Sequence, residues 1–504
     1  MGESVGGYPV RALFDVKTIR TIEQQLFGIF DSFEVMAQAA NALYKRIFQR
    51  WPQVQRFIVV VGGGNNGGDG LLFAGLLQEA GYSVRVLDCA LKARQGDAQK
   101  AYELALSKGV VCQRFADGVV QYADNEFDNI VVVDALLGIG ARLPLSEEVV
   151  KSVQWMNDAH ACGAHLVAVD IATGVDSDTG CAEQNMVMAD LTVSMLQLKL
   201  GNVLGKGGIA SGELVLESLG SSSMLPEPTA YWLEVERLDY RSPCPRQKDS
   251  HKGMFGHVTV IGGDYGFGGA AIMASEAAAK AGAGTVGLLT RGEHLSASLS
   301  RNPNVMVLAS GMESCEQRLL RNHSTLVIGP GLGRASWGKA LFENWLALAV
   351  TNECPVVLDA DGLFWLAQTE EVLLPSGSVL TPHLGEAGRL LGCPVDDILK
   401  DPVAACLTLA KRYSCTVVLK GTTTIVSDEF GSVYVAGRPE PMLAKGGSGD
   451  VLSGMLGACL AYYSSSLTAS VLAVAWHNHS AGLSARALGE HRAQPCDLLD
   501  YIDR

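Results

Sequence analysis

Two regions of the chain share one pattern of hydrophobic and polar positions. Each begins with a short run rich in apolar and β-branched residues, at 57–61 and 257–261, and continues through a glycine-rich segment, at 62–70 and 262–269. A longer segment rich in leucine or alanine then follows. Short β-branched runs predict buried strands and the longer segments predict helices, so each region is expected to form a strand, a tight turn and a helix.

Further β-branched runs end in residues that carry chemistry or permit a tight turn. These residues are Asp134, Asp170, Gly329, Asp359 and Lys420. Continuous apolar strands that alternate with helices are typical of parallel sheets covered on both faces, so both regions are predicted to be α/β. In such sheets ligands bind beyond the carboxyl ends of the strands, which makes these positions candidates for functional sites.

The segment 219–250 is rich in Ser, Pro and charged residues and has no hydrophobic periodicity. A chain of 504 residues is long enough for two or more domains, and this segment is the best candidate for their boundary. We predict a first domain at 1–220, a linker at 221–250 and a second domain at 251–504. Residues 1–51 are expected to supply leading helices to the first domain.

Composition and charge exclude several classes of protein. Apolar residues make up 48% of the chain and charged residues 18%, which is typical of a globular protein and not of a disordered one. A net charge of −14 disfavours nucleic acid and anionic membrane surfaces as partners. The uncharged stretch 451–476 is long enough to span a bilayer, but residues 462–466 interrupt it like a turn between two buried helices.

The cysteines and the first twenty residues indicate the cellular compartment in which the protein is expected. Twelve cysteines are scattered without a CxxC pair, which indicates free thiols in a reducing compartment and neither a zinc site nor a disulfide framework. The first twenty residues contain no apolar segment typical of an export signal. We therefore expect a cytoplasmic protein.

The first glycine-rich loop allows more than one interpretation. Gly62, Gly64 and Gly67 match GxGxxG, and Asp88 follows about twenty residues later, as in a dinucleotide-binding dehydrogenase. However, the loop also carries two asparagines and Asp69, and an aspartate repels phosphate at a helix N-terminus. The loop is therefore better suited to a polar group or a cation, or its glycines serve only close packing.

Beyond this loop the resemblance to a known family is specific. The segments GGGNNGGDG (62–70), VVDALLGIG (132–140), VAVDIATGVDSDTG (167–180) and LKLGNVLGKG (198–207) resemble the epimerase domain of the NAD(P)H-hydrate repair enzymes. The resemblance implies a Rossmann-like three-layer sandwich with Asp170 as the catalytic acid/base and a potassium ion held by Asn66, Asp134 and Thr173. It places the hydrate against Asn65, Asn66, Gly67, Gly68, Asp69, Gly138, Ile139, Gly140, Ala141, Arg142, Leu143, Pro144 and Asp170. The family usually has DIPSG where this chain has DIATG (170–174); Thr173 keeps the hydroxyl, and the proline is lost.

The implied chemistry suits a carboxylate. A hydrated dihydronicotinamide carries a hydroxyl on the carbon beside the ring nitrogen, whose lone pair can expel it once an acid protonates the leaving oxygen. Return of water to the other face inverts the centre, and one carboxylate at a strand end could donate and then remove the proton. Asp170 is the candidate for this role; alternatively, it caps the turn that follows.

A second candidate site lies near the C-terminus. The segment AKGGSGD (444–450) precedes an apolar helix that is expected from Val451. Small residues at a helix N-terminus leave backbone amides and the positive end of the helix dipole facing outward, which makes an anion hole for a transferring phosphoryl group. Asp450 is placed to take a proton from an attacking hydroxyl, or else it is a plain N-cap. The chain has no GxxxxGK[ST], so this is not a P-loop.

The second region resembles the ribokinase-like superfamily and, within it, the ADP- or ATP-dependent hydrate dehydratase domain. The matching segments are HKGMFGHVTVIGG (251–263), GGAAIMASEAAAKAGAGTV (268–286), LVIGPGLG (326–333), VVLDADGL (356–363), LTPHLGEAGRLLG (380–392) and VVLKGTTTIV (417–426). The TPHLGE part favours the dehydratase over sugar kinases. By resemblance, the hydrate contacts Ala270, Gly331, Gly333, His383 and Asp450, and the nucleotide contacts Lys420, Gly421, Thr422, Thr423, Thr424 and Gly449.

The resemblance implies a kinase-like first step. Asp450 would deprotonate the hydrate hydroxyl, which attacks the terminal phosphate while glycine amides and magnesium balance the charge, and phosphate then leaves from the ring. We expect ADP as the usual co-substrate, with ATP possible, hydrates of NADH and NADPH as substrates, and a homo-oligomer. Asp359 and Asp361 either touch magnesium or cap a turn, and His477 and His479 diverge on a helix, which disfavours a metal site.

Two alternatives remain at this point. The protein is a small-molecule kinase for a vitamin precursor or a sugar, fused to a nucleotide-binding module, or its N-terminal domain is a non-catalytic binding module.

Overall fold

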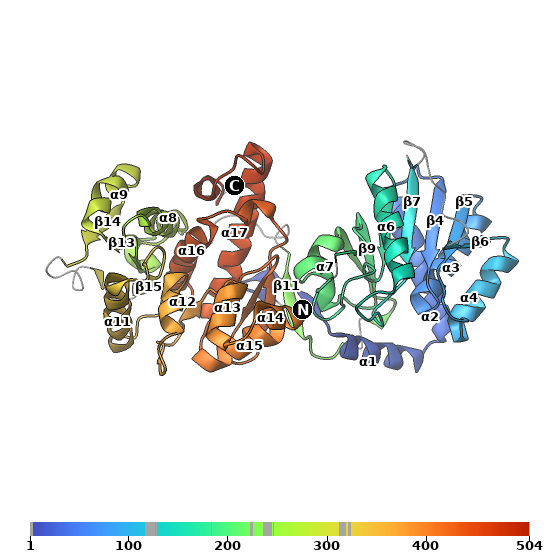
Figure 1. The fold of residues 1–504 in the computed structure, drawn as a ribbon, viewed down its shortest axis with the longest axis horizontal. Coiled ribbons are helices and arrows are strands. Elements are labelled where there is room, and N and C mark those ends of the chain that lie inside the picture. The colour runs from blue at the N-terminus through green and yellow to red at the C-terminus, as the bar shows by residue number, and fades with distance from the viewer. Residues whose placement is uncertain are drawn as a thin grey trace. The chain divides into compact units, whose positions relative to one another are not determined.

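The chain folds into two compact units, Ala12–Ala230 and a second unit made of Met1–Arg11 and Tyr231–Arg504 (Figure 1). The computed structural model describes residues 4–115, 127, 129–182, 184–221, 225–234, 244, 246–311, 319–320 and 324–502. Much of the predicted linker therefore lies outside the described residues.

A single seven-stranded sheet, parallel throughout, forms the centre of the first unit. In sheet order its strands are β10 (Glu213–Glu217), β9 (Leu191–Met195), β8 (His165–Val169), β7 (Ile130–Ala135), β4 (Arg56–Val61), β5 (Ser83–Asp88) and β6 (Val111–Arg114). Its helices are α1 (Val16–Phe27), α2 (Ser32–Arg50), α3 (Asn65–Glu79), α4 (Gly96–Ser107), α6 (Glu147–Ala161) and α7 (Gly205–Ala210).

Alternate residues of each strand bury against opposite layers of helices. Val59 and Val61 of β4 pack in one core with α2, α3 and α4, whereas Ile58 and Val60 pack in another with α6. Successive side chains of a strand point to opposite faces, so a run of apolar residues without alternation belongs in a sheet covered on both sides. The predicted α/β sandwich is confirmed.

The start of α3 differs from the sequence prediction. We expected a turn through Gly70, but the helix begins at Asn65. A Cβ atom on Gly67 would lie 2.2 Å from the carbonyl oxygen of Gly62, and one on Gly70 would lie 2.5 Å from the Cβ of Ala135. The glycines thus let the first turns of α3 pack against the strand ends, a requirement that outweighs the poor helix propensity of glycine.

The second unit contains an eleven-stranded mixed sheet. In sheet order its strands are β14 (Val305–Ala309), β13 (Thr285–Thr290), β12 (His257–Ile261), β15 (Ser324–Ile328), β16 (Val356–Leu358), β17 (Val379–Leu380), β18 (Thr416–Leu419), β19 (Thr424–Ser427), β20 (Val433–Ala436), β11 (Ala230–Leu233) and β3 (Arg11–Leu13). Strands β14 to β18 are parallel, and β19 is antiparallel to both of its neighbours.

Three helices of the second unit pack in one core with the central strands of this sheet. They are α8, α16 and α17. The helices of the unit are α8 (Gly268–Lys280), α9 (Leu295–Arg301), α11 (Ser336–Thr351), α12 (Asp361–Leu366), α13 (Leu384–Leu391), α14 (Val395–Lys400), α15 (Pro402–Tyr413), α16 (Ser448–Tyr462) and α17 (Ser466–Leu488).

The predicted break in the uncharged stretch 451–476 is confirmed, because α16 ends at Tyr462 and α17 begins at Ser466. Both helices contribute many residues to the core of the second unit. Within the described part of the chain, no helix combines the length and the apolar character needed to cross a membrane.

The first residues of the chain belong to the second unit and not to the first. Strands β1 (Ser4–Val5) and β2 (Tyr8–Pro9) form a small antiparallel pair. Val5 is 4% exposed and lies in the same core as Leu472 of α17, and the ring of Tyr8 meets that of Trp476 edge-on at 5.8 Å. The leading helices that we predicted for the first domain therefore begin only after this segment, with α1 and α2.

Candidate active sites

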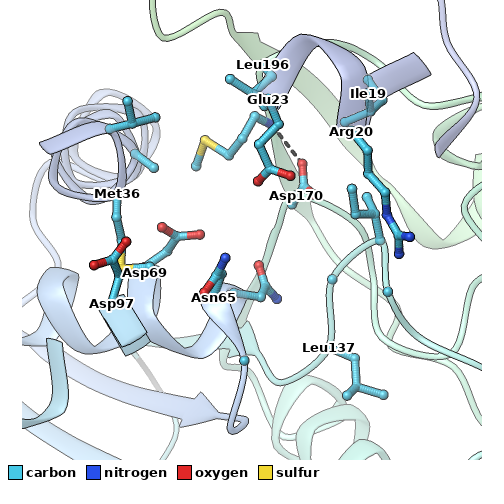
Figure 2. Close-up of a pocket in the computed structure, with 18 of the residues that line it drawn as sticks. Ile19, Arg20, Glu23, Met36, Asn65, Asp69, Asp97, Leu137, Asp170 and Leu196 are labelled. Atoms are coloured by element: carbon cyan, nitrogen blue, oxygen red, sulfur yellow. Dashed lines mark hydrogen bonds between the residues drawn. The ribbon is translucent and has the colours of Figure 1, made fainter. Parts of the chain in front are cut away.

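A pocket of about 430 Å³ lies at the carboxyl ends of the strands of the first unit (Figure 2). Many of the predicted hydrate-site residues line it, namely Asn65, Asn66, Asp69, Gly138, Ile139, Gly140, Ala141 and Asp170. The other five do not: Gly67 and Gly68 are buried in α3, and Arg142, Leu143 and Pro144 follow the lining stretch.

Asp170 follows β8 in an unusual backbone conformation, with φ +70°. Its backbone N–H donates to the carbonyl of Val193 at 2.8 Å, and its carbonyl accepts from the Asn202 side chain at 3.2 Å. Its Oδ1 accepts the backbone N–H of Met195 at 2.9 Å and the ammonium of Lys199. The carboxylate therefore does not cap the following turn, and its strained conformation directs it into the pocket.

Lys199 is a site residue that the sequence analysis missed. Its side chain is 1% exposed, and its ammonium also donates to the carbonyl of Met195 at 2.7 Å and to the hydroxyl of Ser194 at 3.2 Å. A buried ammonium is stable only when it is paired and hydrogen-bonded. The residue lies within LKLGNVLGKG (198–207), but nothing in that pattern marks this lysine as buried.

Asp69 and Glu23 are carboxyl groups that line the pocket with Asp170. Burial raises the pKa of Asp69 well above its ordinary value, and the charges of Asp170 and Glu23 raise it further. Burial also raises the pKa of Glu23, with the charge of Asp170 as the second cause. Glu23 and Arg20 come from α1 and were not predicted, because charged residues on an amphipathic helix normally face solvent.

The buried side chains of Asp134 and Thr173 meet below this pocket. Asp134 is 0% exposed, and it accepts the backbone N–H and the hydroxyl of Thr173, each at 2.8 Å. Burial raises the pKa of Asp134 to about 6, against the opposing effect of these hydrogen bonds. A carboxylate so placed favours a neighbouring cation.

Asn66 supplies an amide to the same region. It is 9% exposed, and neither its amide oxygen nor its nitrogen has a hydrogen-bond partner among the described residues. It packs within about 3.3 Å of the position of a Cβ on Gly138, and the neighbouring Leu137 N–H donates to the Thr173 hydroxyl at 3.1 Å. The predicted potassium ligands come from α3, β7 and the segment after β8, and both Asn66 and Thr173 lie against the loop of Leu137 and Gly138. An amide oxygen without a partner and a buried carboxylate suit a hard cation.

The structure disfavours the dinucleotide-binding interpretation, because Asp88, its expected ribose-binding acid, is bound to another side chain. Asp88 ends β5 as predicted, but its two oxygens accept from the guanidinium of Arg94 at 2.7 and 3.0 Å. Arg94 also donates to the carbonyl of Gly62 at 3.1 Å. The pair is nearly buried, so Asp88 holds the glycine-rich turn in place and is not available to a ribose.

The second candidate site centres on Lys420 and Asp359, at the ends of β18 and β16. The ammonium of Lys420 donates to Asp359 at 2.7 Å, and the hydroxyls of Thr381 and Ser453 each donate to the same carboxylate at 2.7 Å. Burial alone would raise the pKa of Asp359, but Lys420 and these hydroxyls lower it below its ordinary value. Asp361 is also engaged, since it accepts from the Gly333 N–H at 2.9 Å and from Arg334 at 2.8 Å.

Asp450 is placed differently from Asp359. The N-cap of α16 is Gly447, with φ +104°, so Asp450 lies in the first turn and is not the cap. Its carboxylate makes no hydrogen bond or ion pair within the part of the chain that the structure describes. Burial, together with the charge of Asp359, raises its pKa to about 7 against the opposing charge of Lys420. An unpaired carboxylate with this pKa is suited to act as a general base near neutral pH.

The other predicted residues of the second site lie around these groups. A Cβ on Gly449 would lie 3.4 Å from the ammonium of Lys420, and one on Gly331 would lie 3.2 Å from the Cβ of Ala270. His383 pairs with Lys420 in a β-bridge. The remaining predicted nucleotide contacts, Gly421, Thr422, Thr423 and Thr424, form the turn into β19.

His383 has a structural role that can be seen directly. Its Nδ1 accepts the backbone N–H groups of Gly385 and Glu386 at 3.0 and 3.3 Å, and so caps α13. The backbone N–H of His383 donates to the Glu386 carboxylate at 2.8 Å, and burial raises the pKa of Glu386 to about 7. His477 is buried, and burial lowers its pKa to about 4. Among the described residues, no group of three or more His, Cys, Asp or Glu side chains is placed to hold a metal ion.

Lys445 was also missed as a contributor to this site. It lies in the glycine-rich loop, yet its ammonium donates to the backbone carbonyls of Glu490 at 2.9 Å and His491 at 3.1 Å, and to that of Ala493. Lys445 therefore anchors the loop to the segment after α17. A lysine beside glycines suggests a phosphate ligand, but here all three donors are engaged by the backbone.

Together these features describe an α/β protein with two candidate active centres, one built on an ion-paired carboxylate and one on a carboxylate in the first turn of a helix. The family model described as NAD(P)H-hydrate dehydratase matches residues 258–504, and the model described as YjeF-related protein N-terminus matches residues 32–201. The chain is 35% identical to a bifunctional NAD(P)H-hydrate repair enzyme of Coxiella burnetii over 97% of this chain and 98% of the relative. It is 34% identical to that of Escherichia coli, over 94% of this chain and 89% of the relative.

The chain belongs to the family of bifunctional NAD(P)H-hydrate repair enzymes, as the sequence motifs predicted. Among solved structures, it is similar to the ADP/ATP-dependent NAD(P)H-hydrate dehydratase of Bacillus subtilis co-crystallised with ATP and Mg²⁺. That likeness has 28% identity and a TM-score of 0.46, and it covers 51% of this chain and 91% of the other.

Proposed function

We propose that this chain repairs hydrated NADH and NADPH. The first unit interconverts the R and S hydrates, and the second unit dehydrates the S form while ADP is converted to AMP and phosphate. The observation that carries the proposal is the contrast between two carboxylates at strand-end sites. Asp170 is held by a buried ammonium, and Asp450 stands unpaired at the start of α16 with a pKa of about 7.

In the first unit, the pocket would hold the reacting ring beside Asp170. The hydroxyl beside the ring nitrogen leaves as water, and a second water adds to the opposite face of the ring. Lys199 keeps Asp170 in one orientation throughout, because its ammonium also binds the chain at Ser194 and Met195. The backbone of Gly138–Ala141 would shape the wall against which the ring lies.

Potassium fits the residues below this pocket. Asn66, Asp134 and Thr173 would hold it, since Asn66 has an unsatisfied amide oxygen and Asp134 a fully buried carboxylate. When bound, the cation supplies a fixed positive charge that offsets Asp134 and steadies the loop of Leu137 and Gly138.

In the second unit, Asp450 takes the proton from the hydroxyl of the S hydrate. The hydroxyl oxygen then attacks the terminal phosphate of the nucleotide, whose developing charge faces the backbone amides at the start of α16. Phosphate is a better leaving group than hydroxide, so its elimination from the ring restores the dihydronicotinamide. Lys420 and Gly449, which lie close together, would contact the nucleotide.

Two carboxylates near the second site are already bound to other side chains and are not free to coordinate magnesium. Asp359 is occupied by Lys420, Thr381 and Ser453, and Asp361 by Arg334. We therefore propose that magnesium enters with the phosphates of the nucleotide, as it commonly does in phosphoryl-transfer sites, and supplies charge neutralisation there.

The test follows the absorbance of NADH regenerated from a mixture of both hydrate epimers. The purified protein receives potassium and magnesium, with ADP or ATP in separate reactions. Complete, nucleotide-dependent recovery with release of inorganic phosphate supports both activities and selects the donor. Recovery that stops when one epimer is exhausted contradicts the epimerase, and a stable phosphorylated product with no NADH supports a small-molecule kinase.

A further inference from the structure

Asp69 is a carboxyl group in the first pocket to which the mechanism above gives no chemical task. It projects from the second turn of α3, and Figure 2 shows its carboxyl group entering the pocket across from Glu23 and Asp170. It makes no hydrogen bond and no ion pair with the residues that the structure describes. A polar group that lines a pocket without a protein partner is available to a ligand.

Asp170 contrasts with Asp69 in the donors that it receives. Both the Lys199 ammonium and the Met195 N–H reach Oδ1 of Asp170, which favours the ionised form of this carboxylate. No described residue donates to its Oδ2, so that oxygen is open to the pocket. Asp69 has no such donors. The charges of Asp170, Glu23 and Lys199 act on it, and Arg20 of α1 and Asp97 of α4 line the same pocket.

We propose that Asp69 is a second catalytic residue of the epimerisation, acting as a protonated acid across the pocket from the ionised Asp170. This inference rests on the proposed epimerase activity and assigns its two proton transfers to two residues. Inversion at the ring carbon requires one water to leave from one face and another to arrive at the opposite face. Two carboxyl groups on different walls of one pocket match that requirement better than one.

The step balances without any further reactant. Asp69 gives its proton to the hydroxyl oxygen, the carbon–oxygen bond breaks with both electrons leaving on water, and the lone pair of the ring nitrogen forms a carbon–nitrogen double bond. A water then bonds to the opposite face of the carbon and passes a proton to Oδ2 of Asp170, while the electron pair returns to nitrogen. The proton returns to Asp69 through Glu23 or solvent, and the reverse direction exchanges the two roles.

The test compares the full-length Asp69→Asn variant with Asp97→Asn as a matched control. Asp97 also lines the pocket, but its carboxylate is occupied by Ser32 and Lys100. Consumption of the pure R hydrate, with ADP present, reports epimerisation because the second unit removes the S form. Consumption of the S hydrate reports the second unit alone and serves as the control for folding and concentration.

We expect Asp69→Asn to lower kcat for the R hydrate about 10²–10⁴-fold, the usual contribution of a general acid, with KM changed by less than about threefold. The fall of the wild-type rate at alkaline pH, where Asp69 loses its proton, is expected to disappear in this variant, and Asp97→Asn is expected to keep the wild-type profile. An unchanged kcat, or a raised KM alone, overturns the inference and leaves the epimerase intact. A wild-type protein without R-hydrate turnover defeats the proposed function itself.

A second variant keeps the test decisive if Asp69→Asn does not fold. Asp69→Glu retains the carboxyl group and is expected to retain the alkaline fall in rate, with a lower kcat because the group is displaced. Infrared difference spectra of the wild type between pH 5 and pH 9 give a measurement independent of turnover. We expect a protonated carboxyl band at pH 7 in the wild type and in Asp97→Asn, and we expect this band to shift in Asp69→Glu. A wild type without the band, or a band that is unchanged in Asp69→Glu, contradicts the assignment.

Discussion

The buried ammonium of Lys199 offers the most direct test of the architecture of the first site. Lys199→Met removes the charge and keeps most of the volume of the side chain. It leaves Asp170 with one donor, the Met195 N–H, and breaks a buried pair, which costs about 3–5 kcal/mol. Because the side chain of Asp170 keeps 14% of its surface exposed, we expect the lower end of that range, about 3 kcal/mol.

Calorimetry of the full-length protein measures this loss. For a unit the size of Ala12–Ala230, about 3 kcal/mol corresponds to a decrease in Tm of about 6–12 °C, while the transition of the second unit serves as an internal reference. The double variant Lys199→Met with Asp170→Asn is expected to recover most of the stability, because no uncompensated charge remains. A single variant that melts within about 1 °C of the wild type refutes the view that this pair is buried and coupled.

Three further predictions concern other parts of the molecule. The pKa of about 7 for Asp450 predicts that kcat/KM for the S hydrate falls as pH drops below 7. A carboxyl group whose pKa is raised in the folded state lowers the stability of the fold as the pH rises through that pKa. Asp450→Asn is therefore expected to stabilise the second unit at pH 8 by at most about 4 kcal/mol, seen as a higher Tm. A kcat/KM that does not fall below pH 7, or a lowered Tm, contradicts this. Potassium is expected to raise the Tm of the first unit in proportion to the logarithm of its concentration, lithium is not, and Asn66→Leu is expected to lose the response. Gly62→Ala is expected to prevent folding of the first unit, because a Cβ would lie 2.0 Å from the carbonyl of Leu136, whereas Gly64→Ala, with open space around its Cβ, is expected to fold; equal yields of the two proteins would count against the close-packing argument.

The hydrophobic pattern predicted most of the strands and their ends. Asp170, Asp359 and Lys420 directly follow buried strands and Asp134 lies near the end of one, because β-branched runs form buried strands and the polar residues mark where those strands end. The start of α3 was mispredicted for the opposite reason. Glycines disfavour a helix locally, but here they are needed for close contact with residues far along the chain, such as Ala135.

Features that depend on distant partners were not visible in the sequence. Lys199 and Asp170 are 29 residues apart, and only the fold shows that one neutralises the other. Arg94 is only six residues from Asp88, but the GxGxxG spacing that singled out Asp88 does not show that the two side chains pair. Sequence motifs locate chemistry, but the partners that set its charge come from tertiary packing.

The strands of Met1–Arg11 have a consequence for the order in which the protein is made. Val5 is synthesised long before Leu472, which lies 467 residues further along the chain, yet both residues are buried in the same core. At about 5–20 residues per second, this delay is about 20–90 s, during which Ala12–Ala230 has time to fold while the leading strands wait for their partners. Val5 therefore stays without its native partners from α17 until the last part of the second unit has been made.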